Sequence, residues 1–120
     1  MSTFVITKRF NEEYKFEYTS RKGKTIFTSN SFELQFECEN EIEYLKKNLD
    51  SALFLKSKSS SGKFFFRLIL NEKQFAVSRK YSTILMLEKG INDITKYALK
   101  SEIIDFSGND FAFPVIEFAD

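Results

Sequence analysis

Residues 64–70 have the sequence FFFRLIL, in which every second position is a large apolar residue and Arg67 interrupts the other row. A period of two is typical of a β-strand, because successive side chains of a strand point to opposite faces of the sheet. Fifty residues earlier, positions 14–18 have the sequence YKFEY and repeat this alternation with a polar second row. The second row of residues 64–70 is more apolar, so we expect it to be partly covered, by the C-terminal tail or by another subunit.

The similarity of these two segments extends along the chain. A shift of 50 residues aligns Phe4 with Phe54, and a shift of 49 aligns Phe32 with Tyr81. Self-similarity at a nearly fixed spacing is the signature of an internal repeat. We interpret the chain as a single domain, 1–120, with three parts: internal repeat 1 at about 3–50, internal repeat 2 at about 53–106, and a C-terminal tail at 107–120.

Strands joined by short turns are predicted in both repeats. Turn signals rich in Gly, Ser and Asn separate the alternating segments, as in β-hairpins. In the tail, the segment Phe111–Phe118 contains Pro114, which cannot donate to a strand ladder, so this segment is predicted to be an edge strand, an irregular cover or a partner-binding arm. The expected strands are residues 4–8, 14–19, 25–29, 53–58, 64–70, 74–78 and 102–106.

One amphipathic helix is predicted in each repeat, because apolar residues recur there with the period of an α-helix. Each helix has one apolar stripe and is expected to lie on a sheet face with a solvated back. Glu37 and Met86, which precede the stripes, are unfavourable N-caps, so the helix starts are defined only to within a few residues. The two stripes are Cys38, Ile42, Leu45 and Leu49, and Leu87, Ile91, Ile94 and Ala98.

The composition excludes several kinds of chemistry. The chain has no His and no Trp, one Cys and one Pro, beside 15 Phe and 5 Tyr. Without an imidazole, a His base, a His metal ligand and a Ser-His-Asp triad are all excluded. The single Cys38 cannot form an intrachain disulfide, and no apolar run reaches the length of a signal peptide or a membrane span. We therefore expect a cytoplasmic protein that does not bind a membrane.

Short motifs in both repeats resemble those of a known family. Residues 61–66 (SGKFFF) are similar to a family segment SNGKFYF, residues 25–29 (TIFTS) to its ILTS strand, and Tyr81-Ser82 and residues 88–91 (EKGI) to its YSS and ENGI segments. On these residues the chain resembles the YegP-like family of small proteins of uncharacterised function, over roughly residues 4–106.

The resemblance implies an α+β fold made of β-β-β-α(-β) units. In this fold a single antiparallel sheet carries two packed helices, and the C-terminal strands are exchanged between the repeats. One departure is Glu41, which stands where the second repeat has Gly90. If that Gly permits a close approach of helix and sheet, the first helix must sit farther out or turn slightly.

Candidate sites for chemistry are few. Cys38 lies on an apolar stripe between two Glu residues, where burial and negative charge both raise a thiol pKa, so we interpret it as a core residue. Alternate Glu residues at 37–43 point around their helix and are interpreted as a solvated face rather than a cation site. The four Gly residues are isolated, without the spacing of a phosphate-binding loop. We predict no catalytic residue, no cofactor and no metal.

A basic segment interleaved with aromatic residues is the sharper candidate for a binding surface. Residues 51–100 contain ten Lys and Arg against three acids, whereas residues 101–120 contain five acids and no base. Cations with aromatic rings suit single-stranded nucleic acid, although the same cations can simply form a solvated face. The candidate surface comprises Lys56, Lys58, Lys63, Phe65, Arg67, Arg79 and Lys80.

The leading hypothesis is a non-catalytic module that self-associates, as a homodimer, or binds an unknown protein. Its basis is the surplus of aromatic residues over the needs of one small core. Single-stranded nucleic-acid binding is the alternative, and an enzyme is the least favoured reading. A smaller prediction concerns Glu17 and Arg67, which occupy equivalent positions: they form a cross-strand pair if the two Phe-rich strands are neighbours.

Overall fold

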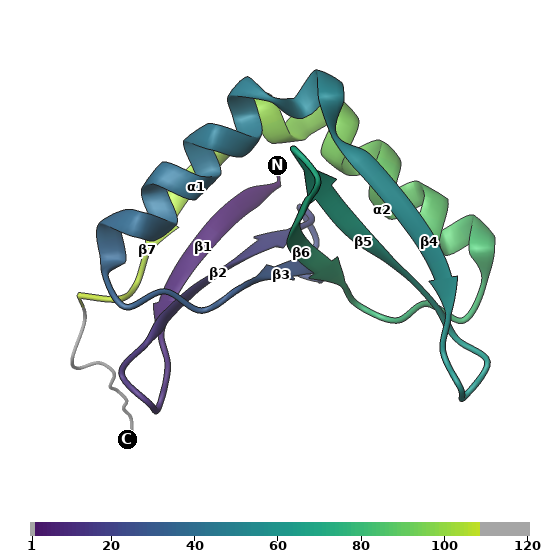
Figure 1. The fold of residues 1–120 in the computed structure, drawn as a ribbon, viewed down its shortest axis with the longest axis horizontal. Helices are drawn as coiled ribbons and strands as arrows, with labels where there is room; N and C mark the ends of the chain where they lie inside the picture. Colours follow the sequence, from purple (N-terminus) through teal and green to yellow (C-terminus); the bar gives the residue numbers. More distant parts are fainter. Residues whose placement is uncertain (1, 109–120) are drawn as a thin grey trace.

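The computed structural model describes residues 2–108, which form one α+β domain fold with a single sheet (Figure 1). The predicted tail strand at Phe111–Phe118, with Pro114, lies outside these residues. The elements are β1 (Thr3–Lys8), β2 (Tyr14–Thr19), β3 (Thr25–Ser29), α1 (Gln35–Lys47), η1 (Leu49–Ser51), β4 (Leu53–Lys58), β5 (Phe64–Leu70), β6 (Lys73–Ser78), α2 (Ile84–Tyr97), η2 (Ala98–Lys100) and β7 (Glu102–Asp105).

The seven strands lie in the order β4-β5-β6-β3-β2-β1-β7. Hairpins connect β1 to β2, β2 to β3, β4 to β5 and β5 to β6, and all of these pairs are antiparallel. The expectation of a purely antiparallel sheet is wrong, because β7 pairs with β1 in parallel. A strand reached through a helix is not bound to reverse direction, and here α2 and η2 carry the chain across to the far edge of the sheet.

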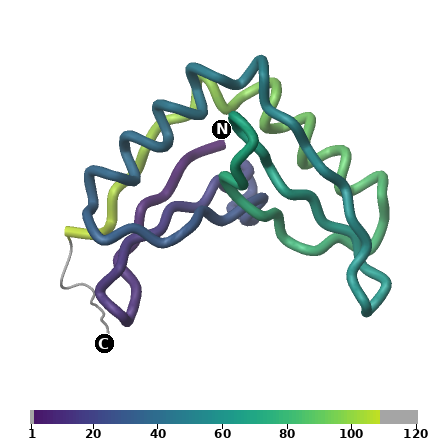
Figure 2. The backbone as a smooth tube through the Cα atoms, in the orientation of Figure 1, coloured from purple at the N-terminus to yellow at the C-terminus, as the bar shows by residue number. Residues whose placement is uncertain are grey.

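The two helices lie along the two arms of an arch (Figure 1). Figure 2 shows the chain crossing the apex of this arch twice, once between α1 and β4 and once between α2 and β7. Because of these crossings, β4 and β7 lie on opposite flanks of the molecule. We call β1–β3 with α1 the first half and β4–β6 with α2 the second half.

One hydrophobic core runs beneath both helices. The predicted stripes face it: Cys38, Ile42 and Leu45 of α1 are fully buried, as are Leu87 and Ile94 of α2. The centre of the core is aromatic, with Phe27 of β3 and Phe75 of β6 packed edge to face at 6.4 Å between ring centroids. Since β3 and β6 are also hydrogen-bonded neighbours, the two halves share one interior.

Both helices begin earlier than the stripes indicated. The N-cap of α2 is Thr83, whose Oγ1 accepts a hydrogen bond from the N–H of Met86 at 3.2 Å. The N-cap of α1 is Leu34, which has no side-chain acceptor, but its own N–H donates to the Glu37 carboxylate at 2.9 Å. Half of a capping box therefore replaces the missing cap in α1.

The same hydrogen bonds occur at corresponding places in the two halves. The Oγ of Ser29 accepts from the N–H of Phe16 at 2.9 Å, and the Oγ of Ser78 accepts from the N–H of Phe66 at 2.8 Å. Each hydroxyl also donates to the carbonyl of the residue that follows it, at 2.7 Å. Each serine is the last residue of its strand and satisfies a buried N–H of the neighbouring strand.

The predicted pair between Glu17 and Arg67 is wrong. The halves meet through β3 and β6, so two strands separate β2, which carries Glu17, from β5, which carries Arg67. Glu17 instead accepts hydrogen bonds from Arg9 at 3.1 Å and from the hydroxyl of Thr25 at 2.9 Å. The alignment of these two positions in the sequence does not specify which strands meet at the centre of the sheet.

The turn between β5 and β6 consists of only Asn71 and Glu72, since Leu70 pairs with Lys73. Both turn residues have positive φ, 49° and 66°, as a type I′ turn requires. Asparagine tolerates this conformation, whereas for Glu it costs about 1 kcal/mol. The shortness of the turn is also why β6 begins at Lys73 rather than at Gln74.

We expect Glu72→Gly to raise the free energy of unfolding by about 0.5 kcal/mol, because relief of the left-handed conformation exceeds the added entropy of the unfolded chain. Denaturant unfolding monitored by circular dichroism measures the change. Gly62→Ala is the matched control and should lower the free energy of unfolding. Gly62 has a φ of 86°, which alanine rarely adopts, and no atom lies within 4 Å of an added Cβ. An unchanged or lower stability of Glu72→Gly would contradict the assignment of strain to this residue.

Candidate functional site

The seven residues of the predicted binding surface are divided between the two faces of the sheet. Lys56 and Lys58 of β4 lie on the face that carries the helices. The Nζ of Lys56 is 3.0 Å from a carboxylate oxygen of Glu88 in α2, and the Nζ of Lys58 lies 5.7 Å from the ring centroid of Phe64. These two cations therefore already have partners within the molecule.

Phe65 and Arg67 point to the opposite face, which neither α1 nor α2 covers and which we call the open face. Their neighbours in β5, Phe66 and Leu68, are fully buried on the helix side, so the alternation of the strand turns Phe65 and Arg67 away from it. Arg67 is exposed and lies opposite Leu55 on one side and Val77 on the other. Within residues 2–108 it makes no ion pair.

The other three cations are near the ends of strands. Lys63 lies in the turn before β5, and Arg79 and Lys80 follow β6; all three are exposed. The guanidinium of Arg79 lies over the ring of Tyr81, 5.3 Å from its centroid. The structure therefore brings together Phe65 and Arg67 on the open face but does not assemble all seven residues into one platform.

An apolar cluster surrounds Arg67 on the open face of the second half. Its most exposed members are in β4, with exposed fractions of 53% for Leu53 and 37% for Leu55. The other members are half-buried. We call this cluster the apolar face: Leu53, Leu55, Phe65, Ile69 and Val77.

The corresponding surface of the first half is more polar, although Val5 and its neighbour Ile104 in β7 are apolar there. Across β1, β2 and β3 the aligned residues Val5, Glu17 and Thr28 occupy it, and Glu17 is bonded to Arg9 and Thr25. The greater apolarity predicted for the second half is therefore present in the structure. The predicted cover is not among residues 2–108, in which the two leucines of β4 are exposed.

A groove of about 470 Å³ lies between β4 and α2, beside the outer edge of the sheet. Leu53 borders both this groove and the apolar face, because it is at the start of the edge strand. No pattern in the sequence indicates this groove, since only the position of β4 at the edge leaves it open. The lining residues are Ala52, Leu53, Phe54, Lys56, Glu88, Ile91 and Asn92.

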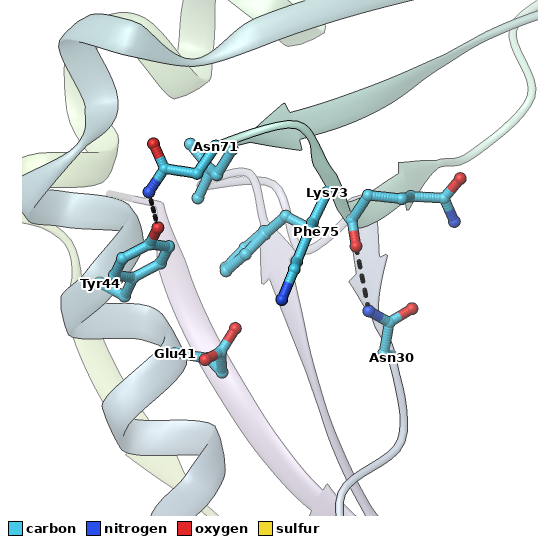
Figure 3. Close-up of a pocket in the computed structure, with 8 residues that line it drawn as sticks. Asn30, Glu41, Tyr44, Asn71, Lys73 and Phe75 are labelled. Atoms are coloured by element: carbon cyan, nitrogen blue, oxygen red, sulfur yellow. Dashed lines mark hydrogen bonds between the residues drawn. The ribbon is translucent and has the colours of Figure 1, made fainter.

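A second groove, of about 330 Å³, lies between α1 and the β5–β6 hairpin (Figure 3). Glu41 projects from α1 toward it, and the ammonium of Lys73 comes from the opposite wall. Burial, and then the charge of Glu37, raise the pKa of Glu41, while Lys73 lowers it. The hydroxyl of Tyr44 accepts a hydrogen bond from the amide of Asn71, which closes one end of the groove. With one carboxylate and one ammonium, this groove has no pair of carboxylates for acid-base work among its lining residues.

On the other side, α2 is tied to the first half by hydrogen bonds. The carboxylate of Asp93 accepts from the hydroxyls of Tyr18 and Ser2, both at 2.7 Å. Tyr18 is fully buried, and burial, followed by the hydrogen bond to Asp93, raises its pKa. Asp93 thus serves the structure, and its acceptor atom already has two donors.

Cys38 is a core residue, as predicted. Its side chain is fully buried, and burial, with Asp105 and Glu37 adding to it, raises the pKa of the thiol to about 12. In the described part of the chain, no three His, Cys, Asp or Glu side chains gather as metal ligands would. None of the helices within residues 2–108 is both long and apolar enough to span a membrane.

The chain is similar to proteins that have no assigned activity. It is 27% identical over 105 residues to the "UPF0339 protein in ptx operon 5'region" of Stutzerimonas stutzeri, covering 86% of this chain and 95% of that protein. It is also 27% identical over 93 residues to the UPF0339 protein YegP of Escherichia coli, covering 76% and 84%. No protein-family model matches the chain.

Two solved structures share the fold. The solution NMR structure of the protein of unknown function YegP from Escherichia coli superimposes with a TM-score of 0.80 at 24% identity, covering 91% of this chain and 96% of that one. The solution NMR structure of a UPF0339 protein from Shewanella oneidensis gives a TM-score of 0.78 at 22% identity, covering 88% and 92%. These likenesses establish the α+β fold with one sheet.

Proposed function

We propose that this chain, as a member of the YegP-like family of uncharacterised function, is a non-catalytic interaction module. It associates with a second copy of itself through the apolar face. The observation that carries this proposal is the exposure of Leu53 and Leu55 beside half-buried Phe65, Ile69 and Val77. The same surface of the first half is more polar, with Glu17 and Thr28 on it, so the apolar residues are concentrated in the second half.

The proposal includes a single domain, 1–120, that arose by duplication of a half-length unit. Paired features support this origin, such as the serines that bond Phe16 and Phe66. A second example is the Nζ of Lys8 over Tyr14, at 5.9 Å, beside that of Lys58 over Phe64. The pairing of β7 with β1 supports exchange of the C-terminal strand between the units. A cytoplasmic location is part of the same proposal, and the lone thiol of Cys38 agrees with it.

Light scattering after size exclusion, over a range of concentrations, tests the self-association. We expect the full chain to have twice the monomer mass and Leu53→Glu to weaken association about 100-fold or more, because it places an unpaired charge in an apolar contact. Phe10→Glu is the matched control, since Phe10 is fully exposed in the turn after β1. A chain that stays monomeric at every concentration would rule the proposal out.

Single-stranded nucleic acid is the alternative occupant of the open face, on which Arg67 and Phe65 are alternate residues of β5. A cation and an aromatic ring on one sheet surface suit a phosphate and a base. A salt titration of oligonucleotide affinity tests this hypothesis. Binding that weakens with salt and is lost in Arg67→Ala supports it, and no binding at low salt refutes it.

A further inference from the structure

We propose that the partner contributes its own C-terminal tail, residues 109–120, as an added strand along the outer edge of β4. This inference rests on the self-association proposed above and specifies its contact. The strands β1 and β4 occupy equivalent positions in the two halves but differ in their outer neighbours. In the order β4-β5-β6-β3-β2-β1-β7, β1 has β7 on its outer side, whereas β4 is an edge strand within residues 2–108.

The groove between β4 and α2 lies where β7 lies in the other half. There, β7 runs beside β1, and its Ile103 packs against the core. The Nζ of Lys46 in α1 donates to the carbonyl of Ser101, just before β7, at 2.7 Å. In the second half the chain passes from α1 through η1 directly into β4, and no strand of residues 2–108 fills the corresponding place. A strand added there would send alternate side chains into the groove and beside Leu53 and Leu55.

The tail has the composition that this edge requires. Residues 109–120 (NDFAFPVIEFAD) contain three acids and no base, with large apolar side chains at Phe111, Phe113, Val115, Ile116 and Phe118. The strand β4 contains Lys56 and Lys58 and no acid. Pro114 fits an added strand, because alternate N–H groups of an edge strand point outward and need no partner.

The tail of the same chain cannot make this contact. It begins after Gly108, beyond β7, at the opposite flank from β4 (Figure 1). Six strand spacings of about 4.8 Å separate the two edges, roughly 29 Å along the sheet. Twelve extended residues reach about 40 Å, so only about three would remain to pair with β4. The eight residues of Phe111–Phe118 can lie along β4 only if they come from another copy.

A direct pairing of β4 with the β4 of a second copy is disfavoured. A two-fold axis at Lys56 or Ser57 would place lysines of the two copies opposite each other. Like charges facing each other across two strands are destabilising, and lysines on an edge strand are a common protection against such pairing. Reciprocal exchange of tails instead gives a closed dimer with two identical contacts.

Mixing two defective full-length chains tests the exchange. Phe113→Asp/Val115→Asp damages only the tail, and Leu53→Glu damages only the β4 edge. We expect each chain alone to be monomeric at concentrations where the unchanged chain is dimeric. Mixed in equal amounts, they should form a heterodimer, since one intact tail meets one intact edge; native mass spectrometry resolves the two masses. Phe10→Asp is the control and should stay dimeric.

The outcomes separate this inference from the proposed function. If the tail variant remains dimeric while Leu53→Glu is monomeric, the apolar face associates without the tail and the inference is wrong. A mixture that yields no heterodimer, although each variant alone is monomeric, also overturns it. If the unchanged chain is monomeric at all concentrations, both proposals fail.

Discussion

Raising the pH above about 9 is expected to destabilise the protein steeply. Burial raises the pKa of the Cys38 thiol from 9.0 to about 12, and it also raises the pKa values of the Tyr18 and Tyr81 hydroxyls above 10.0. Below pH 9 both the folded and the unfolded chain hold these protons, so their contribution to stability is fully present. Above pH 9 and then pH 10 the unfolded chain releases protons that the folded chain retains, and the free energy of unfolding falls.

Each of these groups lowers the free energy of unfolding by at most about 1.4 kcal/mol per pH unit. Denaturant unfolding at a series of pH values from 8 to about 12 measures the slope. Cys38→Ala should remove the loss between pH 9 and 10, and Tyr18→Phe should reduce the slope above pH 10. Tyr97→Phe is the control, because Tyr97 is exposed on α2. A stability that does not change between pH 8 and 11 would contradict the burial of these groups as protonated acids.

Substitution of Gly90 by Ala is expected to cost about 1–3 kcal/mol of stability, as overpacking of a core typically does. A Cβ at Gly90 would lie 2.6 Å from the hydroxyl oxygen of Tyr81 and 3.3 Å from its Cζ. That hydroxyl is buried and has no hydrogen-bond partner among the described residues. The first half has Phe32 and Glu41 at the corresponding positions, so there a residue with a Cβ is combined with a ring that has no hydroxyl.

Adding Tyr81→Phe should therefore restore most of the stability that Gly90→Ala loses. Tyr81→Phe alone should be neutral or stabilising, because it removes an unsatisfied buried polar atom. Thermal or denaturant unfolding of the four chains of this double-mutant cycle measures the coupling. Gly108→Ala is the control, since no atom lies within 4 Å of its added Cβ. Additive effects of the two substitutions would show that the Tyr81 hydroxyl is not what limits the space.

Local elements could be predicted from the sequence because each depends on the side chains of neighbouring residues. Alternation gave all seven strands of residues 2–108 to within about a residue at each end, and the apolar stripes gave both helices. The interpretation of Cys38 as a core residue depended on the same stripe and is confirmed. The start of α2 was missed although Thr83 is a good N-cap, because the stripe itself begins four residues later.

The candidate surface was only partly predictable. The apolar residues of β5 opposite the core were visible in the alternation, but the cover predicted for them is not among residues 2–108. Lys56 and Lys58 were grouped with Arg67 because cations and aromatic residues are interleaved in this part of the sequence, but the register of β4 against β5 places the two lysines on the other face. The groove beside β4 had no sequence signal, because it exists only where a sheet edge and a helix leave space.

The chain's own pattern determined which residues form strands and helices, which side of each is buried, and which chemistries are excluded, because these follow from side-chain type and spacing. Only the tertiary structure decided that β3 and β6 are neighbours, that β7 lies parallel to β1, and that β4 is left at an edge. The reason is that strand order depends on the paths of the connections. The crossings between α1 and β4 and between α2 and β7 place strands by long-range packing that no local period encodes.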